Sequence, residues 1–141
     1  MITKQQLLDY LKNDVYVRVG PSKIHGVGLI AVRDIPKGIN PFKNLIEPET
    51  YEVTAEDLKE VPPQVVKMVY DYFGVEDGTV FLPITGMNPM DLLHYINHSD
   101  DANVKVLNEG WLFETTRDVK EGEELTSNYS TYDDPGFKEK F

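Results

Sequence analysis

The feature that most limits what this chain can fold into is the frequency of its turns. Ten glycines and nine prolines are spread through 141 residues and separate short apolar runs. Residues 15–19 alternate Val with Tyr and Arg and end at Gly20-Pro21, and residues 28–32 form the next run. Short runs bounded by turn residues at intervals of about 8 to 12 residues are typical of strands in small sheets. We therefore predict a mostly β fold with a few helices.

Helical spacing is confined to a few segments. Leucines at helical spacing after the capping residue Thr3 predict an N-terminal helix within residues 1–13. A capping pattern predicts a helix over residues 54–60, and apolar residues at every third and fourth position predict another over 65–73. A short helical turn is expected over residues 88–95.

Strand signals return in the second half of the chain. Residues 80–84, 104–107 and 111–115 are short apolar runs, and the turn residues at 108–110 predict that the last two form a hairpin. A chain of 141 residues without internal repeats is close to the usual size of one domain. We expect residues 1–141 to fold as a single domain.

The charge of the chain indicates which partners it favours. Fourteen Lys and Arg residues against 24 Asp and Glu residues give a net charge of −10. Such a surface repels the phosphates of nucleic acids and attracts segments rich in Lys and Arg. We expect no direct nucleic-acid binding and favour a basic protein or peptide as partner, although an acidic surface also serves solubility alone.

Cysteine usage and hydropathy exclude several classes of protein. Because the chain has no Cys, it has no disulfides, thiolate metal sites or cysteine nucleophiles. The first 13 residues lack the apolar core of a signal peptide, and the apolar run over residues 27–32 is too short to cross a bilayer. We expect a soluble, intracellular protein that does not enter a membrane.

Three segments carry residues suited to chemistry. The first is Gly26-Val27-Gly28, where bare backbone N–H groups can approach a ligand or form a plain hairpin turn. The second is Asn97-His98-Ser99, a polar loop that suits either a structural network or a polar small molecule. The third, residues 124–129, ends at Tyr129, which taken alone suggests packing.

A metal site is an alternative for the second segment. His94 and His98 are four residues apart and could share one helix face, with Asp91 or Asp100 as a third ligand. A metal-dependent hydrolase would then be the function. However, Asn97 indicates that the helix ends before His98, and no Glu stands beside His94 as a zinc protease requires. We assign no metal ligands.

Together and in this order, the three segments resemble the SET domain of protein lysine methyltransferases. Residues 26–31 are similar to the first glycine motif of the family, residues 97–103 to its Asn-His-Ser motif, and residues 124–129 to its Glu-Leu-Thr-x-Asp-Tyr motif. The resemblance covers about residues 15 to 132, and the size of the chain without zinc-binding flanks suggests the minimal forms found in viruses and bacteria. Ala102 and Asn128 depart from the usual Pro and Asp.

The resemblance implies a fold and a division of the chain. The fold would consist of small β-sheets with a knot-like threading of the C-terminal motif and a helical insert. Residues 15–43 and 88–132 would be the N-terminal and C-terminal parts of the SET domain. Residues 44–87 would be the insert, residues 1–13 an added helix, and residues 133–141 a tail.

The resemblance also implies a function and a site. The activity would be transfer of methyl groups from S-adenosylmethionine to a lysine of a basic protein, for which a histone is one candidate, with a nuclear location in that case. The implied cofactor-binding residues are Gly26, Val27, Gly28, Asn97 and His98. Tyr129 would be the catalytic residue. The alternative from another class is a non-catalytic SET-like module that binds a basic peptide.

The lysine channel lacks the cysteine-rich segment that closes it in many relatives. The resemblance implies that Val106, Ser127 and Tyr132 are candidates to line this channel, and a homodimer is one way to complete it. Relatives often limit the number of methyl groups with an aromatic residue at the positions that Val106 and Ser127 occupy here. Because neither side chain is aromatic, we predict dimethyl and trimethyl products.

Overall fold

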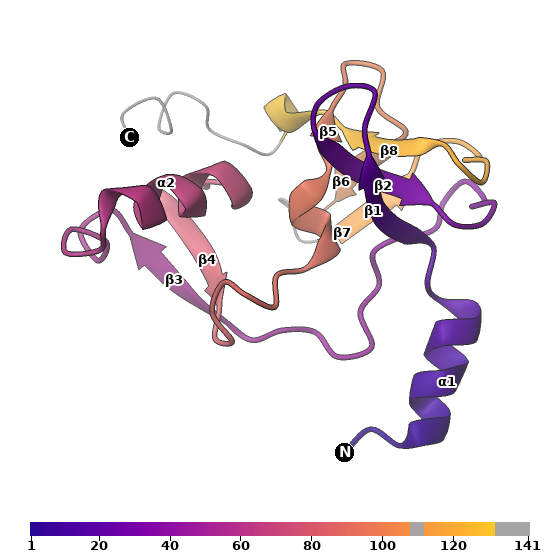
Figure 1. Cartoon of the computed structure of the whole chain (residues 1–141), viewed down its shortest axis with the longest axis horizontal. Coiled ribbons are helices and arrows are strands. Elements are labelled where there is room, and N and C mark those ends of the chain that lie inside the picture. Colours follow the sequence, from indigo (N-terminus) through magenta and orange to yellow (C-terminus); the bar gives the residue numbers. More distant parts are fainter. Residues whose placement is uncertain (108–111, 132–141) are drawn as a thin grey trace.

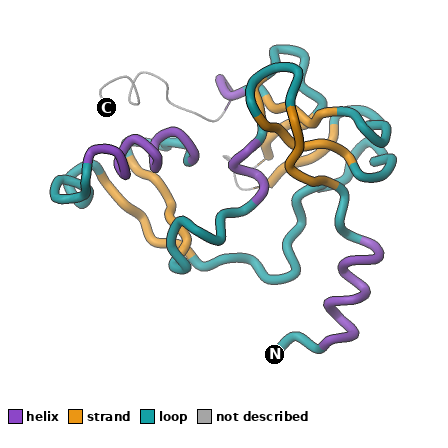
Figure 2. The backbone as a smooth tube through the Cα atoms, in the orientation of Figure 1, coloured by secondary structure: helices purple, strands orange, loops and turns teal. Residues whose placement is uncertain are grey.

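The computed structural model describes residues 1–107 and 112–131 and has two main parts, a β-sheet and a smaller helical insert (Figure 1). The described residues form mostly strands, with two α-helices, which confirms the predicted fold class. In Figure 2, loop segments on either side of the insert connect it to the sheet. No helix in the described part of the chain is long and apolar enough to cross a bilayer.

The N-terminal helix α1 spans Lys4–Asn13, as predicted. Thr3 accepts a hydrogen bond from the Gln6 N–H and the Gln6 side chain accepts one from the Thr3 N–H, so both members of a capping box are present. None of the helix residues is buried. The helix extends from the sheet, and the Tyr10 hydroxyl donates to the Lys43 carbonyl at 2.9 Å.

The main sheet comes from both ends of the sequence. Its strands within the described residues are β1 (Val17–Pro21), β2 (Val27–Ala31), β5 (Asn97–His98), β6 (Val104–Leu107), β7 (Leu112–Thr115) and β8 (Glu124–Ser127). The order is β1-β2-β8-β6-β7, and β5 also pairs with β8. The predicted strands in these regions are confirmed, as is the antiparallel pairing of β6 with β7.

Strand β8 is the centre of this arrangement. It pairs antiparallel with β2 and parallel with both β5 and β6. A strand near the C-terminus therefore lies between the glycine motif and the Asn-His-Ser motif, which are far apart in the sequence. The knot-like threading of this segment stays a prediction, and it is compatible with the position of β8.

A hydrophobic cluster beneath the sheet fixes these strands. Leu29 of β2 and Leu125 of β8 are fully buried at the centre, and they are partners in the strand register. The other buried members of this cluster are Val17, Ala31, Ile35, Ile96, Val104, Phe113 and Val119. Leu29 and Ala31 alternate along β2 and so point to the same face, whereas Ile35, Ile96 and Val119 lie outside the strands.

The insert has a second hydrophobic cluster of its own. It contains β3 (Thr50–Thr54), β4 (Thr79–Pro83) and α2 (Pro63–Tyr72), with β3 and β4 paired antiparallel. The buried residues of this cluster are Leu58, Val69, Tyr70, Phe73, Val75 and Val80. Helix α2 and strand β4 match the predicted segments. The boundaries of the insert and of the other predicted parts stay a prediction.

Two sequence expectations for the insert were wrong. Residues 55–60 form hydrogen-bonded turns, because the Leu58 N–H donates to the Ala55 carbonyl and the Lys59 N–H to the Glu56 carbonyl, three residues back. Asp57 accepts from the Thr54 N–H and hydroxyl, so the capping pattern closes a turn after β3. Strand β3 itself was missed, and it is largely exposed.

Candidate functional site

Tyr129 lies beside His98, which is the first relationship that builds the site. β5 and β8 run parallel with His98 opposite Ser127, so the residues after β8 pass the His98 ring. The Tyr129 N–H donates to Nδ1 of His98 at 3.0 Å, and the two rings meet edge to face at 5.3 Å. The Tyr129 hydroxyl donates to the backbone carbonyl of Ile96. The motifs at 97–99 and 124–129 therefore form one structural unit.

The Asn97 side chain connects that unit to the glycine turn, residues 22–28, which consists of the loop after β1 and the first two residues of β2. Its Nδ2 lies 3.2 Å from the His25 carbonyl, 3.0 Å from the Val27 carbonyl and 2.9 Å from Oε2 of Glu124. The hydroxyl of Ser22 is a fourth acceptor at 3.0 Å. An amide nitrogen carries two hydrogens, so it satisfies at most two of these acceptors fully at one time.

The register of β1 and β2 explains why the Val27 carbonyl is available to Asn97. The Ser22 N–H donates to the Gly26 carbonyl at 2.9 Å, which directs the carbonyl of Gly26 toward β1. Successive carbonyls of a strand point to opposite sides, so the carbonyl of Val27 points away from β1, where it accepts from Nδ2 of Asn97 in β5. The glycine turn thus presents backbone oxygens to the Asn-His segment.

Gly26 and Gly28 are each required as glycine, but for different structural reasons. Gly26 has a φ of +49°, a conformation that a side chain disfavours, and a Cβ there would meet no other atom within 4 Å. At Gly28 a Cβ would overlap Oε2 of Glu124 and lie 2.9 Å from Nδ2 of Asn97. Gly26 is therefore needed for the turn, and Gly28 for the approach of two side chains.

Ser22 and Glu124 belong to the site although sequence reasoning gave them no role. In the sequence Ser22 follows the Gly20-Pro21 turn directly, and Glu124 lies in the segment over residues 124–129 that ends at Tyr129. The Ser22 hydroxyl donates to Oε1 of Glu124 at 2.6 Å. A Ser hydroxyl often accepts from the backbone N–H groups two and three residues later in a turn. This local signal could have identified Ser22.

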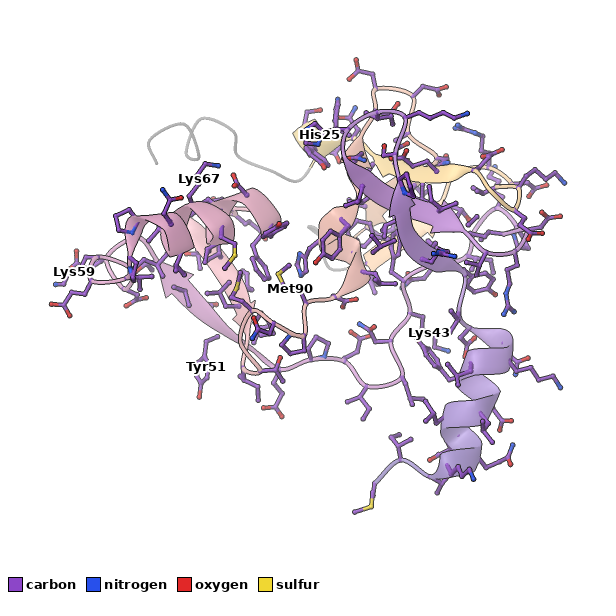
Figure 3. All side chains as sticks on the ribbon, in the orientation of Figure 1. His25, Lys43, Tyr51, Lys59, Lys67 and Met90 are labelled. Carbon is purple, nitrogen blue, oxygen red and sulfur yellow. The ribbon has the colours of Figure 1, made fainter. Side chains whose placement is uncertain are left out.

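A cavity of about 780 Å³ lies on another side of Tyr129. Its walls come from the end of α1, from β1, from the loop at 41–48, from residues 71–76 and from the segment around η1 (Leu92–Tyr95), the predicted helical turn. Tyr129 and Ile96 line it, whereas Gly26, Val27, Gly28, Asn97 and His98 do not. In Figure 3, Met90 and Lys43 mark this side, and His25 lies away from it.

The cavity has an acidic character. Its charged lining residues are Asp14, Lys43, Glu47, Asp71, Glu76 and Asp91, with the titratable His94. Burial raises the pKa of the Tyr10 hydroxyl, and the nearby carboxylates of Asp91, Asp14 and Glu47 raise it further. These three carboxylates therefore act on one end of the cavity, where they would favour a positive charge.

The two histidines of the alternative metal site have separate partners. Nδ1 of His94 lies 2.8 Å from the Tyr72 carbonyl, and its ring contacts Phe73 at 4.2 Å between centroids. His98 uses Nδ1 for Tyr129 and Nε2 for Asp100, at 3.0 Å. Within residues 1–107 and 112–131, no three His, Asp or Glu side chains are grouped as a metal would require. The geometry gives no support to a metal-dependent hydrolase.

The channel candidates lie at different depths. Ser127 is fully buried in β8, opposite Val104 of β6. Val106 is half-buried and packs against the main cluster. Neither lines the cavity beside Tyr129. Tyr132 lies outside the described residues. The assignment of these three residues to a lysine channel stays a prediction.

Solved structures with a similar fold support a common architecture. A Plasmodium falciparum protein assigned as a histone methyltransferase is 20% identical, with a TM-score of 0.52, and the match covers 82% of this chain and 93% of that one. The apo Polycomb Repressive Complex 2 of Chaetomium thermophilum, with two mutations in Ezh2, is 24% identical with a TM-score of 0.59. Its autoinhibited form bound to S-adenosylmethionine is 26% identical with a TM-score of 0.57.

The extent of these matches differs. Both Polycomb matches cover 89% of this chain but only 16% of the other chain. The similarity is therefore limited to a small part of each Polycomb chain. No curated protein sequence matches the chain.

The fold and the site define a small β domain in which a glycine turn, an Asn-His strand and a Tyr surround one central strand. A family model of the SET domain matches residues 26–130, which is more than half of the chain and includes all three motifs. This protein belongs to the SET-domain family, as the resemblance implied.

Proposed function

We propose that this protein transfers methyl groups from S-adenosylmethionine to a lysine side chain of a basic protein or peptide. The observation that carries the proposal is the position of Tyr129. Its backbone and ring contact His98, next to Asn97 and the glycine turn, while its side chain also lines the acidic cavity. A methyl donor bound at the glycine turn and Asn97 would meet, beside Tyr129, a lysine that enters through the acidic cavity.

The chemistry around Asn97 supports cofactor binding on the first side. The carbonyls of His25 and Val27, the Ser22 hydroxyl and the Glu124 carboxylate present more acceptors than the amide of Asn97 can satisfy. The backbone carbonyls that the amide leaves unsatisfied would suit an ammonium group such as that of the methionine portion of the cofactor, while Ser22 and Glu124 hold the turn that presents them. Gly26, Val27, Gly28, Asn97 and His98 would hold the cofactor, which supplies an electrophilic methyl group on a sulfonium.

The residues of the chain would align the lysine and exclude water. The neutral amine attacks the methyl carbon with its lone pair, the carbon–sulfur bond breaks, and the extra proton on nitrogen passes to solvent. A lysine with a pKa near 10.4 loses its proton at pH 8 at a cost of about 3 kcal/mol. The Tyr129 hydroxyl, which donates to the Ile96 carbonyl, would orient the amine, and such positioning can lower a barrier by several kcal/mol.

The acidic cavity supports a basic substrate. Asp14, Glu47 and Asp91 surround the end of the cavity near Tyr10, and Asp71 and Glu76 belong to the wall from the insert. Carboxylates on both walls attract a Lys- or Arg-rich segment and increase its rate of association. A histone tail has this character, and with such a substrate the protein would act in the nucleus. The homodimer stays a prediction that a measurement of mass in solution would test.

The test is methylation of a basic peptide library. The protein is incubated with S-adenosylmethionine, and peptides are analysed by mass spectrometry for gains of one or more methyl groups on lysine. We expect methylated peptides with the wild-type protein and methylation that is slower by more than about tenfold with Tyr129→Phe under the same conditions. Binding of peptide and cofactor without any mass gain would instead indicate a non-catalytic SET-like binding module.

A further inference from the structure

The hydroxyl of Ser22 lies at the centre of the glycine turn. It accepts hydrogen bonds from the N–H of Ile24 at 2.9 Å and of His25 at 3.2 Å, and it donates to Oε1 of Glu124 at 2.6 Å. Nδ2 of Asn97 lies 3.0 Å from the same oxygen. One side chain therefore connects the backbone of the turn to β8 and to β5.

Glu124 completes this connection from the other end of the chain. It begins β8, where it is paired with Ile30 of β2, and its carboxylate occupies the space beside the bare Cα of Gly28. One carboxylate oxygen accepts from Ser22 and the other from Asn97 at 2.9 Å. The absence of a side chain at Gly28 and the presence of a carboxylate at Glu124 are thus two parts of one fit.

We propose that Ser22 and Glu124 are positioning residues for cofactor binding. They fix the backbone of residues 24–28 in the shape that receives the cofactor, and they act through the turn and Asn97. The inference rests on the proposed function. A turn with a glycine at positive φ can adopt several shapes, and ordering it on binding reduces affinity. The hydrogen bonds of Ser22 select one shape in advance.

The main test is Ser22→Ala, with affinity for S-adenosylhomocysteine measured by calorimetry and kinetics measured with a basic peptide. We expect the Kd and the KM for the cofactor to rise about tenfold, with kcat at saturating cofactor changed by less than about twofold. Ser22→Thr keeps the hydroxyl and should restore most of the affinity. Thr54→Ala is the matched control, because it removes a hydroxyl that closes a turn in the insert, and it should leave both values unchanged.

Glu124→Gln gives a second, independent readout. Glutamine keeps the volume but has one oxygen, so its NH2 group replaces the acceptor either for Ser22 or for Nδ2 of Asn97. We expect Kd to rise about threefold to tenfold, and the double variant to be no weaker than about the larger single effect, since both changes act on the same contact. If Ser22→Ala fails to fold, this variant alone decides the result.

The outcomes separate this inference from the proposed function. The positioning role is wrong, while the proposed function stands, if the wild-type protein binds S-adenosylhomocysteine and both single variants bind it with a Kd within about twofold of the wild-type value. If the wild-type protein itself neither binds the product nor methylates any peptide, the proposed function is wrong and the inference is overturned with it. Loss of thermal stability with unchanged affinity in the folded variants would indicate a structural role only.

Discussion

Asn103 and Thr126 form a buried hydrogen bond in which Oδ1 of Asn103 accepts the Thr126 N–H at 2.8 Å. Nδ2 of the same side chain donates to the Glu124 carbonyl at 2.9 Å, so one carboxamide satisfies two backbone groups of β8. Asn103 is only 2% exposed. The last residue of the Asn-His-Ser motif therefore positions the strand that leads to Tyr129.

Asn103→Ala should destabilise the protein strongly. The substitution leaves two backbone groups of β8 without their partners, and each buried unsatisfied group costs about 1 to 3 kcal/mol. We expect the free energy of unfolding to fall by about 2 to 4 kcal/mol in urea titrations. Asn13→Ala, at the exposed end of α1, is the control. A similar stability for both variants would contradict the role assigned to Asn103.

Tyr129→Phe should separate catalysis from cofactor binding. The hydroxyl is expected to orient the amine, whereas the cofactor is expected to contact the glycine turn and the Asn-His strand. We expect kcat to fall by more than about tenfold, equivalent to at least about 1.4 kcal/mol in the barrier, with the Kd for S-adenosylhomocysteine nearly unchanged. Tyr51→Phe, on the exposed face of β3, is the control. A variant that keeps more activity than this would refute the assignment.

Asn97→Ala, in contrast to Tyr129→Phe, should weaken cofactor binding. Loss of a polar contact worth about 1 to 3 kcal/mol weakens binding of S-adenosylhomocysteine by about fivefold to more than a hundredfold. Calorimetry measures this change directly. The variant also removes the connection to the glycine turn, so the thermal transition should be recorded in parallel. An unchanged affinity would show that the Asn-His segment is purely structural.

The half-buried position of His94 predicts a dependence of stability on pH. Partial burial lowers the pKa of His94 below its ordinary value of 6.5, although the hydrogen bond with the Tyr72 carbonyl and the charge of Asp91 act in the opposite direction. The unfolded chain then binds a proton more readily than the folded one. The free energy of unfolding should therefore decrease as pH falls through about 6.5 toward the lower folded pKa.

Unfolding curves between about pH 8 and pH 5 test this dependence. In His94→Gln the contribution of this residue is absent, so the loss of stability on acidification should be smaller than in the wild-type protein. Parallel pH profiles for the two proteins would contradict the prediction. The folded variant must first be shown to have a cooperative transition, because His94 also packs against Phe73.

The absence of an aromatic ring at Val106 and Ser127 predicts the number of methyl groups. In the channel that the resemblance implies, the absence of a phenolic hydroxyl at either position would leave a methylated amine room to turn for another transfer. We expect dimethyl-lysine and trimethyl-lysine to accumulate at long times with excess cofactor, as measured by mass spectrometry. Accumulation that stops at monomethyl-lysine on a good substrate would refute this explanation. The burial of Ser127 means that an aromatic substitution there would also test packing.

The sequence could predict the elements whose local signals agree with their packing. The capped helix α1, the alternating strand β1, the apolar strand β2 and the hairpin of β6 and β7 are examples. It could not predict β3, because this strand is largely exposed and its partner β4 follows α2 in the sequence. The Thr54 pattern was misassigned because a Thr followed three residues later by Asp closes a turn as readily as it begins a helix.

The sequence could predict the three motifs of the candidate site but not their arrangement in space. Three short segments could be identified, but the sequence does not indicate that β8 lies between the other two. The contact of Ser22 with Glu124 joins residues 102 positions apart, so no local pattern contains it. The cavity beside Tyr129 likewise depends on how α2 and η1 meet, through the rings of Tyr72 and Tyr95 and of Phe73 and His94.

The separate hydrophobic cluster of the insert has an evolutionary consequence. One wall of the acidic cavity is built from residues supported by that cluster, while the glycine turn and Tyr129 depend on the main sheet. Substitutions that reshape the insert therefore alter the surface offered to a target protein without passing through the contacts of Asn97. In a lineage with changing targets, residues 50–83 are expected to diverge faster than the three motifs.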